Sequence, residues 1–523
     1  MKRFILPLIT VLLGISLVSS ANSQTASSPS AQPVVRLSSI GFAKLEGSPD
    51  ATTLQEVWKL PSTSELRHRV LDKLGLWLIA REIPGANSDP EAGARELRPL
   101  LNDLLQERIE LEIGKAQNQP WTWTLAIQLP ESRAELWKTH LGNLQKQAGL
   151  EKTAPRSPFA FTQTDSWFVV SNQQPAPADG AASLANNSVV QRIISNPGPG
   201  SSNTFLSLDL DLSSFDRELP GPFRGRPKHL SAKLRGSKTT FKTELTLEFK
   251  EPLGLSLEPW KVPTGTIRDS QNSLMSFTAV QGIRSWVSHN PFLKSLEIDP
   301  APNQFFTWGQ TYAPFQIQAA LPVANGDAQI DSLETRRMPE WNKILAKNSV
   351  GKLERLPNDS GFLWRALPIL TPYLRAVKEP GQDYLLSGLF PVPPSTNPPP
   401  AELISQLTNR DNVLYYDWEI TQFRLAQVRS LIPLLSIITT LPPLDTSAPA
   451  NLWMEAIQSK LGNTVTELSL PSPDTISMLR TSHIGLNGLE LVALAYWLES
   501  PEFPRTSWNP GFRPVSSELP QKP

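Results

Sequence analysis

The chain of 523 residues contains no cysteine, and this absence excludes several classes of protein at once. Disulfide scaffolds, zinc ribbons, iron–sulfur clusters and thiol nucleophiles all require cysteine side chains. Charge is also scarce, because 19% of the residues are charged against about 25% in ordinary domains. The 49 basic and 49 acidic residues cancel, so we expect no overall field that attracts nucleic acid, and no nucleic-acid partner.

Motifs that bind common cofactors or perform common chemistry are missing as well. The sequence has no GxGxxG, no GxxxxGK(S/T), no GxSxG and no HExxH. One S-x-x-K run, Ser349 to Lys352, lacks the SDN and KTG motifs that accompany a catalytic serine of that type. We therefore expect no cofactor and no metal site, and we leave any catalytic residue unknown. The five histidines are far apart in the sequence: His68, His140, His229, His289 and His483.

The N-terminus has the pattern of a secretory signal peptide. Lys2 and Arg3 precede an apolar run of 15 residues, and the small Ala21 and Ser23 predict cleavage after residue 23. That run is shorter than the roughly 20 residues that span a membrane, and a retained anchor is the alternative. No later apolar run is long enough, so we expect export to the periplasm or the extracellular space without a transmembrane span after signal removal.

Pro-rich stretches divide the remainder of the chain, which has 50 prolines in total. The clearest of them are 174–187 and 391–400. We expect a signal peptide over 1–23, a flexible leader over 24–50, and three α+β regions over 51–265, 266–395 and 396–523, the last with a Pro-rich tail.

The hydrophobic periods predict an α+β fold of repeated strand–helix–strand–strand units on mainly antiparallel sheets. Residues Trp121–Leu129 alternate apolar and polar side chains, and a helix and a hairpin over 159–171 follow. The same order recurs from Phe315–Leu321, and more loosely from Val413. We therefore expect the first two strands to be equivalent. Capping patterns predict further helices at Ser62 with Glu65, Asp89 with Pro90, and Asn487 with Glu490.

Two acidic pairs lie on predicted strands. Asp209 with Asp211, and Asp417 with Glu419, each have the i,i+2 spacing that turns both carboxyl groups to one face. Paired carboxyl groups carry out glycoside hydrolysis. The alternative is that a half-buried strand turns its polar residues to solvent.

One span is strongly basic, with seven positive side chains and no acid between residues 224 and 242. We expect a binding surface for an anionic envelope polymer there, and the alternative is a solvated strand that its charges protect from aggregation. The residues that we select as binding candidates are Arg224, Arg226, Lys228, Lys233 and Arg235.

Several of these features are similar to exported bacterial proteins of a domain-of-unknown-function family. They are the signal, the strand–helix–strand–strand order, a short helix leading into the strand Thr204–Asp211 within Ser183–Phe215, and the stretches VLYYDWEIT (Val413–Thr421) and WLESPEFP (Trp497–Pro504). The resemblance implies an envelope protein without an assigned activity.

Together these observations predict an exported, non-catalytic envelope protein that binds a polymer or a protein partner. The alternative is a hydrolase that acts on cell-envelope or environmental polysaccharide, which would need carboxyl groups gathered in one site.

Overall fold

The computed structural model describes the chain from residue 32 to residue 505 with several gaps. The described residues are 32–82, 89–115, 121–147, 160–164, 166–172, 190–191, 203–214, 218–219, 223–267, 274–290, 294, 296–311, 317–356, 360–366, 370–390, 401–408, 410–438 and 444–505. The expected signal peptide 1–23 and the Pro-rich stretches 174–187 and 391–400 lie outside them, so the expectations about these segments stay predictions.

The described residues form 18 strands and 12 helices. The strands are β1 (Gln32–Ser39), β2 (Ile109–Lys115), β3 (Thr122–Gln128), β4 (Ala160–Thr164), β5 (Trp167–Ser171), β6 (Thr204–Asp211), β7 (Pro227–Ser237), β8 (Thr240–Phe249), β9 (Leu274–Gln281), β10 (Gln304–Gln310), β11 (Ile317–Val323), β12 (Lys352–Arg355), β13 (Gly361–Arg365), β14 (Tyr373–Glu379), β15 (Gln382–Gly388), β16 (Val413–Ile420), β17 (Asn463–Ser472) and β18 (Thr475–Ser482). The helices are α2 (Phe42–Leu45), α3 (Thr52–Trp58), α4 (Pro61–Glu82), α5 (Pro90–Gln106), α6 (Glu131–Gln147), α10 (Arg284–His289), α12 (Gly326–Arg336), α13 (Met338–Lys347), α14 (Ala401–Ser405), α15 (Thr421–Ile438), α16 (Pro449–Gln458) and α17 (Gly488–Glu499).

Antiparallel pairings join all 18 strands into one sheet. In its middle, β8 pairs with β18, although the two strands are far apart in the sequence. Outward from this joint the pairing order is β8-β7-β6-β1-β2-β3-β5-β4 on one side. On the other side it is β18-β17-β16-β9-β10-β11-β15-β14-β13-β12.

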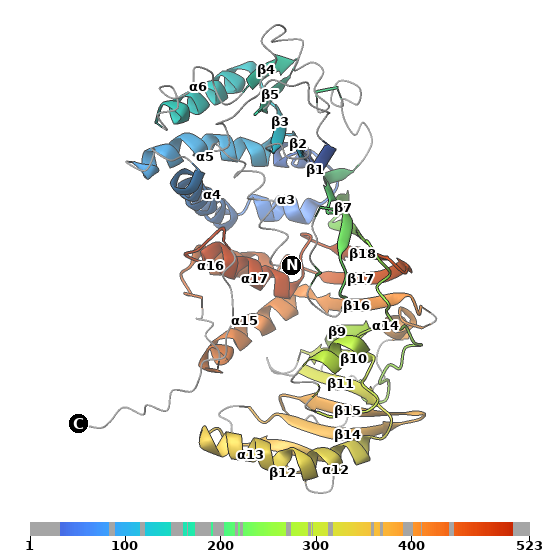
Figure 1. Cartoon of the computed structure of the whole chain (residues 1–523). Helices are drawn as coiled ribbons and strands as arrows, with labels where there is room; N and C mark the ends of the chain where they lie inside the picture. Colours follow the sequence, from blue (N-terminus) through green and yellow to red (C-terminus); the bar gives the residue numbers. More distant parts are fainter. Residues whose placement is uncertain are drawn as a thin grey trace, which may run out of the picture.

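Most helices cover one face of this sheet (Figure 1). Leu37, Leu111 and Leu125 are neighbours in register on β1, β2 and β3, and they share a buried core with Leu100 of α5 and Trp137 of α6. Burying such side chains stabilises the layer by about 1.5–3 kcal/mol each relative to leaving them exposed. The helix layer continues across the joint, because residues of α3 and α4 share a second core with α15, α16 and α17.

The opposite face is also covered in the half that contains β16. Phe277, Phe306, Trp308 and Tyr416 form a core there, and Leu403 of α14 contributes to the same core. Strand β16 is therefore buried on both faces. Its odd-numbered acids lie under the helices, while Tyr416 and Trp418 lie on the side away from them.

Local expectations from the sequence agree with the structure in most places. Strand β3 falls within the predicted 121–129, and β4 pairs with β5 as the predicted hairpin. Asp89 caps α5 by accepting a hydrogen bond from the Ala92 N–H at 2.9 Å. Asn487 and Glu490 form the predicted capping box of α17. Patterns of three to five residues are enough to determine these features because their partners are local.

In the N-terminal part, one expectation is wrong and one strand is not predicted. Residues 32–50 lie within the predicted flexible leader, yet they form β1 and α2. The apolar Val35 and Leu37 are buried because β1 lies between β2 and β6, a position that its local composition does not reveal. Strand β2 is absent from the predicted elements, although it carries Ile109, Leu111 and Ile113 in the core beneath α5.

The coarse fold expectation is confirmed, since helices are combined with antiparallel strands. The finer expectation, an α+β fold of repeated strand–helix–strand–strand units, stays a prediction and is taken up under the proposed function. Strands from all three expected regions, 51–265, 266–395 and 396–523, belong to the one sheet. Within the described residues, no helix has the length and apolar character needed to cross a membrane.

The central β8–β18 joint can be tested with cysteines because the chain has none of its own. Thr246 of β8 lies directly opposite Ser477 of β18, at the roughly 4.5–5.5 Å Cα separation that disulfides accept. We expect Thr246→Cys with Ser477→Cys to form a disulfide under mild oxidation, detected by peptide mapping. The control pair Thr246→Cys with Ser469→Cys, two strands apart at about 9.6 Å, should stay reduced. Equal oxidation of both pairs would contradict the strand order.

Candidate functional site

Buried polar side chains lie between the sheet and the helices α15 and α17. Asp417 and Glu419 of β16 face these helices, and only 6% and 1% of their surfaces are exposed. The residues opposite them on β9 and β17 all carry hydroxyl groups: Ser276, Thr278, Thr464 and Thr466. We call these six residues, together with the buried Arg480 and the partly exposed Arg424 and Glu490, the buried polar row.

Each acid of β16 accepts a hydrogen bond from a neighbouring element. The Thr278 hydroxyl donates to Asp417 Oδ1 at 2.6 Å, which links β16 to β9. The N–H of Gly488, the first residue of α17, donates to Glu419 Oε1 at 2.7 Å. The positive end of the helix dipole attracts negative charge at this position, although burial opposes the ionised form. Glu419 therefore fastens the start of α17 to the sheet.

Two arginines complete the row. Arg480 of β18 donates from both terminal nitrogens to the Glu490 carboxylate, at 2.6 and 2.9 Å, and from Nε to Thr466 Oγ1 at 2.9 Å. Arg424 of α15 donates to Ser276 Oγ of β9 at 3.1 Å. A two-pronged arginine–carboxylate pair fixes orientation as well as distance. The arginines thus connect both helices to the sheet.

Burial changes the acidity of the two acids of β16. Desolvation, with the nearby Asp417 carboxylate, raises the pKa of Glu419 to about 7, although the hydrogen bonds from Gly488 and Thr421 oppose the rise. Desolvation also raises the pKa of Asp417, against the hydrogen bond from Thr278 and the attraction of Arg424. Two neighbouring acids with raised pKa values can hold a proton close to neutral pH.

A glycine makes room for this arrangement. A Cβ at Gly309 of β10 would lie 2.9 Å from Ser276 Oγ and from Met275 Cε, and 3.6 Å from an Arg424 terminal nitrogen. Contacts under 3.0 Å require the neighbours to move. The absence of a side chain at 309 therefore leaves room for the Ser276 hydroxyl, which accepts the hydrogen bond from Arg424.

The second acidic pair lies elsewhere and in a different environment. Asp209 of β6 is exposed, and its Oδ2 is 3.2 Å from His229 Nε2 on β7. A hydrogen bond from the Ser213 side chain lowers the pKa of Asp211. Strands β6 and β16 are five positions apart in the sheet, or about 24 Å, so the structure does not bring the two pairs together.

The basic span forms part of β7 and the turn before it. Leu234 lies on the helix-covered side with the core around Phe205 and Phe241, so Lys233 and Arg235 lie on the opposite, solvent side. Acids of β8 and of the residues after it neutralise much of the span. Arg235 pairs with Glu244 at 3.4 Å, and Lys233 lies opposite Glu244 in register.

The remaining basic candidates follow the same pattern. Lys228 pairs with Glu248 at 3.5 Å, and Arg226 pairs with Glu251. Arg224 is exposed. The sequence span has no acid of its own, but the antiparallel partner strand supplies acids across the pairing. Cross-strand ion pairs on an exposed face contribute only about 0–1 kcal/mol each, so they leave the side chains able to rearrange for a partner.

Other sequence candidates do not assemble into a catalytic or metal site. Lys352 of the S-x-x-K run pairs with Glu354 at 2.6 Å and is exposed. His140 pairs with Glu96, and His289 Nδ1 is 2.7 Å from the Ser285 carbonyl oxygen. Among the described residues, no group of three or more acidic, histidine or cysteine side chains could hold a metal ion.

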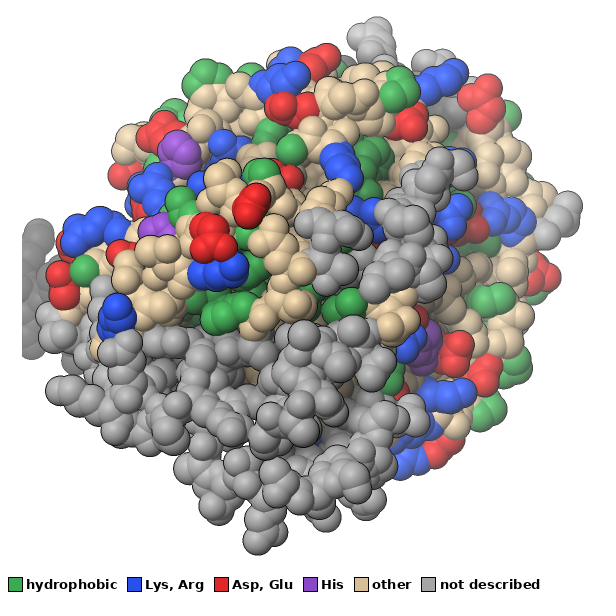
Figure 2. Space-filling model, turned by 90° about the horizontal axis from the view of Figure 1, so that it is seen from above, with side chains coloured by type: hydrophobic (Ala, Val, Ile, Leu, Met, Phe, Trp, Pro, Cys, Tyr) green, Lys and Arg blue, Asp and Glu red, His purple; other side chains and the backbone are tan. Residues whose placement is uncertain are grey.

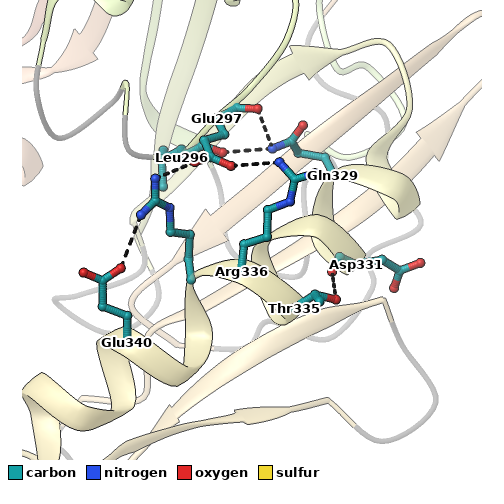
Figure 3. Close-up of polar contacts among 8 residues, drawn as sticks. Leu296, Glu297, Gln329, Asp331, Thr335, Arg336 and Glu340 are labelled. Atoms are coloured by element: carbon teal, nitrogen blue, oxygen red, sulfur yellow. Dashed lines mark hydrogen bonds and ion pairs between the residues drawn. The ribbon is translucent and has the colours of Figure 1, made fainter.

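A second polar cluster is exposed and surrounds Glu297 (Figure 3). Arg336 donates to Glu297 Oε2 at 3.3 Å and Arg337 pairs with Oε1, while Gln329 donates to the Leu296 carbonyl oxygen at 2.9 Å. The hydrogen bond from Arg336 is the main reason that the pKa of Glu297 is lowered. These contacts fasten residues 296–297 to the junction of α12 and α13, which is a structural role.

Sequence reasoning selects Asp417 and Glu419 but misses their surroundings. Arg480 and Arg424 are single arginines in otherwise ordinary segments, and Glu490 is selected only as a helix cap. The expectation that a half-buried strand turns its acids to solvent holds for Asp209 and is wrong for β16, which is buried on both faces. Polar residues alternate with Tyr416 and Trp418 along β16, which is the pattern of a strand with one buried face. The sequence therefore does not indicate that the other face is also buried.

A scan against protein-family models, a search of curated proteins and a search of solved structures each found no match.

The ion pair in the buried polar row should matter far more than an exposed one of the same chemistry. Arg480→Met leaves the Glu490 carboxylate, whose side chain is only 16% exposed, without its guanidinium partner, and we expect a loss of about 3 kcal/mol in the free energy of unfolding. The matched control is Arg235→Met, which breaks the exposed pair with Glu244 and should cost about 1 kcal/mol or less. Urea unfolding measures the free energy of unfolding of both variants. Similar losses in the two variants would show that the ion pair of the buried polar row contributes no more to stability than an exposed pair.

Proposed function

We propose that this protein is an exported, non-catalytic binding protein. The main support for this proposal is that the paired acidic residues have structural roles. Asp417 and Glu419 are buried beneath α15 and α17 and fasten elements together, whereas Asp209 is on a distant strand. A hydrolytic pair would instead have to meet its substrate. This arrangement supports a protein whose buried charges serve the fold.

We propose that the partner binds the solvent side of the central strands, which we call the open strand face. It is formed by the side chains of β6, β7, β8 and β18 that point away from the helix layer. Its members include Asp209, Ser231, Lys233, Arg235, Glu244, Thr246, Ser477 and Leu479. Leu479 is 48% exposed among these polar neighbours.

The charges of this face favour a protein partner over an anionic polymer. Lys228 and Arg235 lie within ion-pair distance of Glu248 and Glu244, so a polyanion would have to displace acids from both. Another view of the surface has the same mixture, since Figure 2 shows basic and acidic side chains interspersed among the described residues. Mixed charges around an apolar centre are typical of protein interfaces.

The partner site should be found by position-specific photo-crosslinking in cells. A photoreactive residue in place of Leu479 should give a discrete adduct with one protein. The control position is Ile344 of α13, which is 52% exposed but lies outside the open strand face. Lys233→Glu with Arg235→Glu should weaken the adduct at 479, with folding checked by circular dichroism.

Adducts at both positions, or at neither, would contradict the assigned face. Salt-sensitive retention on an anionic polysaccharide, abolished by the double substitution, would instead identify the polymer as the partner.

Export is the second part of the proposal and rests on the N-terminal pattern. We expect the mature protein to begin at Gln24, because Ala21 and Ser23 suit the cleavage rule. N-terminal sequencing of the protein from the periplasm or medium tests this. Recovery of Met1 in the membrane fraction would show a retained anchor. We also propose, from the sequence resemblance alone, that the protein belongs to the family of exported proteins of unknown function named above.

We also propose that the fold contains two repeated α+β units, the first in the predicted strand–helix–strand–strand order and the second with the additional strands β12 and β13 between its helices and the hairpin β14–β15. The matched pairing orders on the two sides of the β8–β18 joint support this. Strand β3 lies between β2 and β5 and precedes α6, and β11 lies between β10 and β15 and precedes α12. The stretch from Val413 then completes the second unit, because β16 corresponds to β6.

One observation favours the alternative of a polysaccharide hydrolase. Glu419, with a pKa of about 7 beside Asp417, has the acidity of a general acid. Assays on cell-wall and environmental polysaccharides with Glu419→Gln as the control test this. Hydrolysis that this substitution abolishes would overturn the non-catalytic assignment.

A further inference from the structure

The charges of the buried polar row do not balance unless a proton is present. The row contains three carboxyl groups, on Asp417, Glu419 and Glu490, and two guanidinium groups, on Arg424 and Arg480. With all five groups ionised, the row carries one net negative charge beneath the helices. A buried charge without a partner is costly, whereas one retained proton makes the row neutral.

We propose that Asp417 and Glu419 retain one proton between them and form a pH-sensitive latch, which holds α15 and α17 on the sheet while the proton is bound. When the pH rises, the proton passes to solvent and the two adjacent carboxylates repel each other. The inference depends on the geometry of the buried polar row and is independent of the proposed binding function.

The latch position follows from what the two acids touch. Glu419 accepts the hydrogen bond from the first N–H of α17, and Thr421 at the start of α15 is its other neighbour. Thr421 Oγ1 and Thr464 Oγ1 are 2.7 Å apart, which joins α15 to β17. A change of charge at Glu419 therefore acts on the beginnings of both helices at once.

Every element packed against the pair contributes a group that faces it. Helix α15 supplies Arg424, α17 supplies Glu490, and β18 supplies Arg480, while β9 and β17 supply hydroxyl groups. Tyr415 on the same strand stays protonated, because burial raises its pKa. His483 accepts a hydrogen bond from the Gly462 N–H at 3.3 Å, and burial lowers its pKa, so it stays neutral above pH 7.

The direction of the pH effect follows from the raised pKa of Glu419. An acid whose pKa is higher in the folded state stabilises the fold fully below its unfolded pKa near 4.5 and loses that contribution as the pH rises through about 7. The two helices should therefore be held most firmly in mildly acidic solution, loosen as the pH rises toward 7, and loosen no further above it.

Hydrogen exchange of the full-length protein between pH 5.5 and 8.5, corrected for the pH dependence of intrinsic exchange, tests the latch. We expect amide protection in 421–438 and 488–499 to fall by up to about tenfold for each pH unit between pH 5.5 and about 7 and to level off above that, while α5 keeps its protection. Glu419→Gln and Asp417→Asn should each abolish this loss, because each leaves two carboxylates opposite two guanidinium groups.

The matched control is Asp209→Asn with Asp211→Asn, the exposed pair with the same spacing, which should keep the wild-type pH profile. His483→Gln should also keep it. Protection of α15 and α17 that does not change with pH in the wild type would overturn the proposal. A wild-type pH profile that is unchanged in both Glu419→Gln and Asp417→Asn would also overturn it. If one of these variants does not fold, the result for the other variant is used.

Discussion

The fold depends on a buried set of charges that must satisfy one another. Arg480, Glu490, Arg424, Asp417 and Glu419 lie where the helix layer meets the sheet, and water cannot solvate the two acids of β16. The surrounding helices contribute apolar packing through Leu425 and Leu491, which is strong but not directional. Hydrogen bonds are directional, so the bonds of the buried polar row fix the positions of the first residues of α15 and α17 relative to the strands.

This constraint separates the two functions that paired acids allow. A catalytic carboxyl group needs a raised pKa and access to substrate, and Glu419 has the first. Its oxygen is instead engaged by the first turn of α17, so substrate could reach it only if the helix moved. The central strands offer a different surface, with exchangeable ion pairs around an exposed Leu479. Binding there requires no movement of the core.

The sequence predicts local structure well and distant pairing poorly. The period of β3, the hairpin β4–β5 and the caps Asp89 and Asn487 involve residues a few positions apart, and all of them are confirmed. The β8–β18 joint and the central place of β1 join segments whose partners no local pattern specifies. The same limit applies to charge, because Lys233 belongs to an acid-free span in the sequence and yet faces Glu244 across the sheet. For the candidate site, spacing alone selects the two acids, while the arginines whose charges act on Asp417 come from β18 and α15.

The claim that connects these points is that the buried polar row is neutral only with a bound proton. Infrared difference spectroscopy of the wild type between pH 6 and pH 8.5 measures this directly, since a protonated carboxyl group has its own C=O stretching band. We expect one buried carboxyl band that disappears as the pH rises and is absent from both Glu419→Gln and Asp417→Asn. A spectrum without such a band at pH 6, or a band that both substitutions leave unchanged, would contradict this claim.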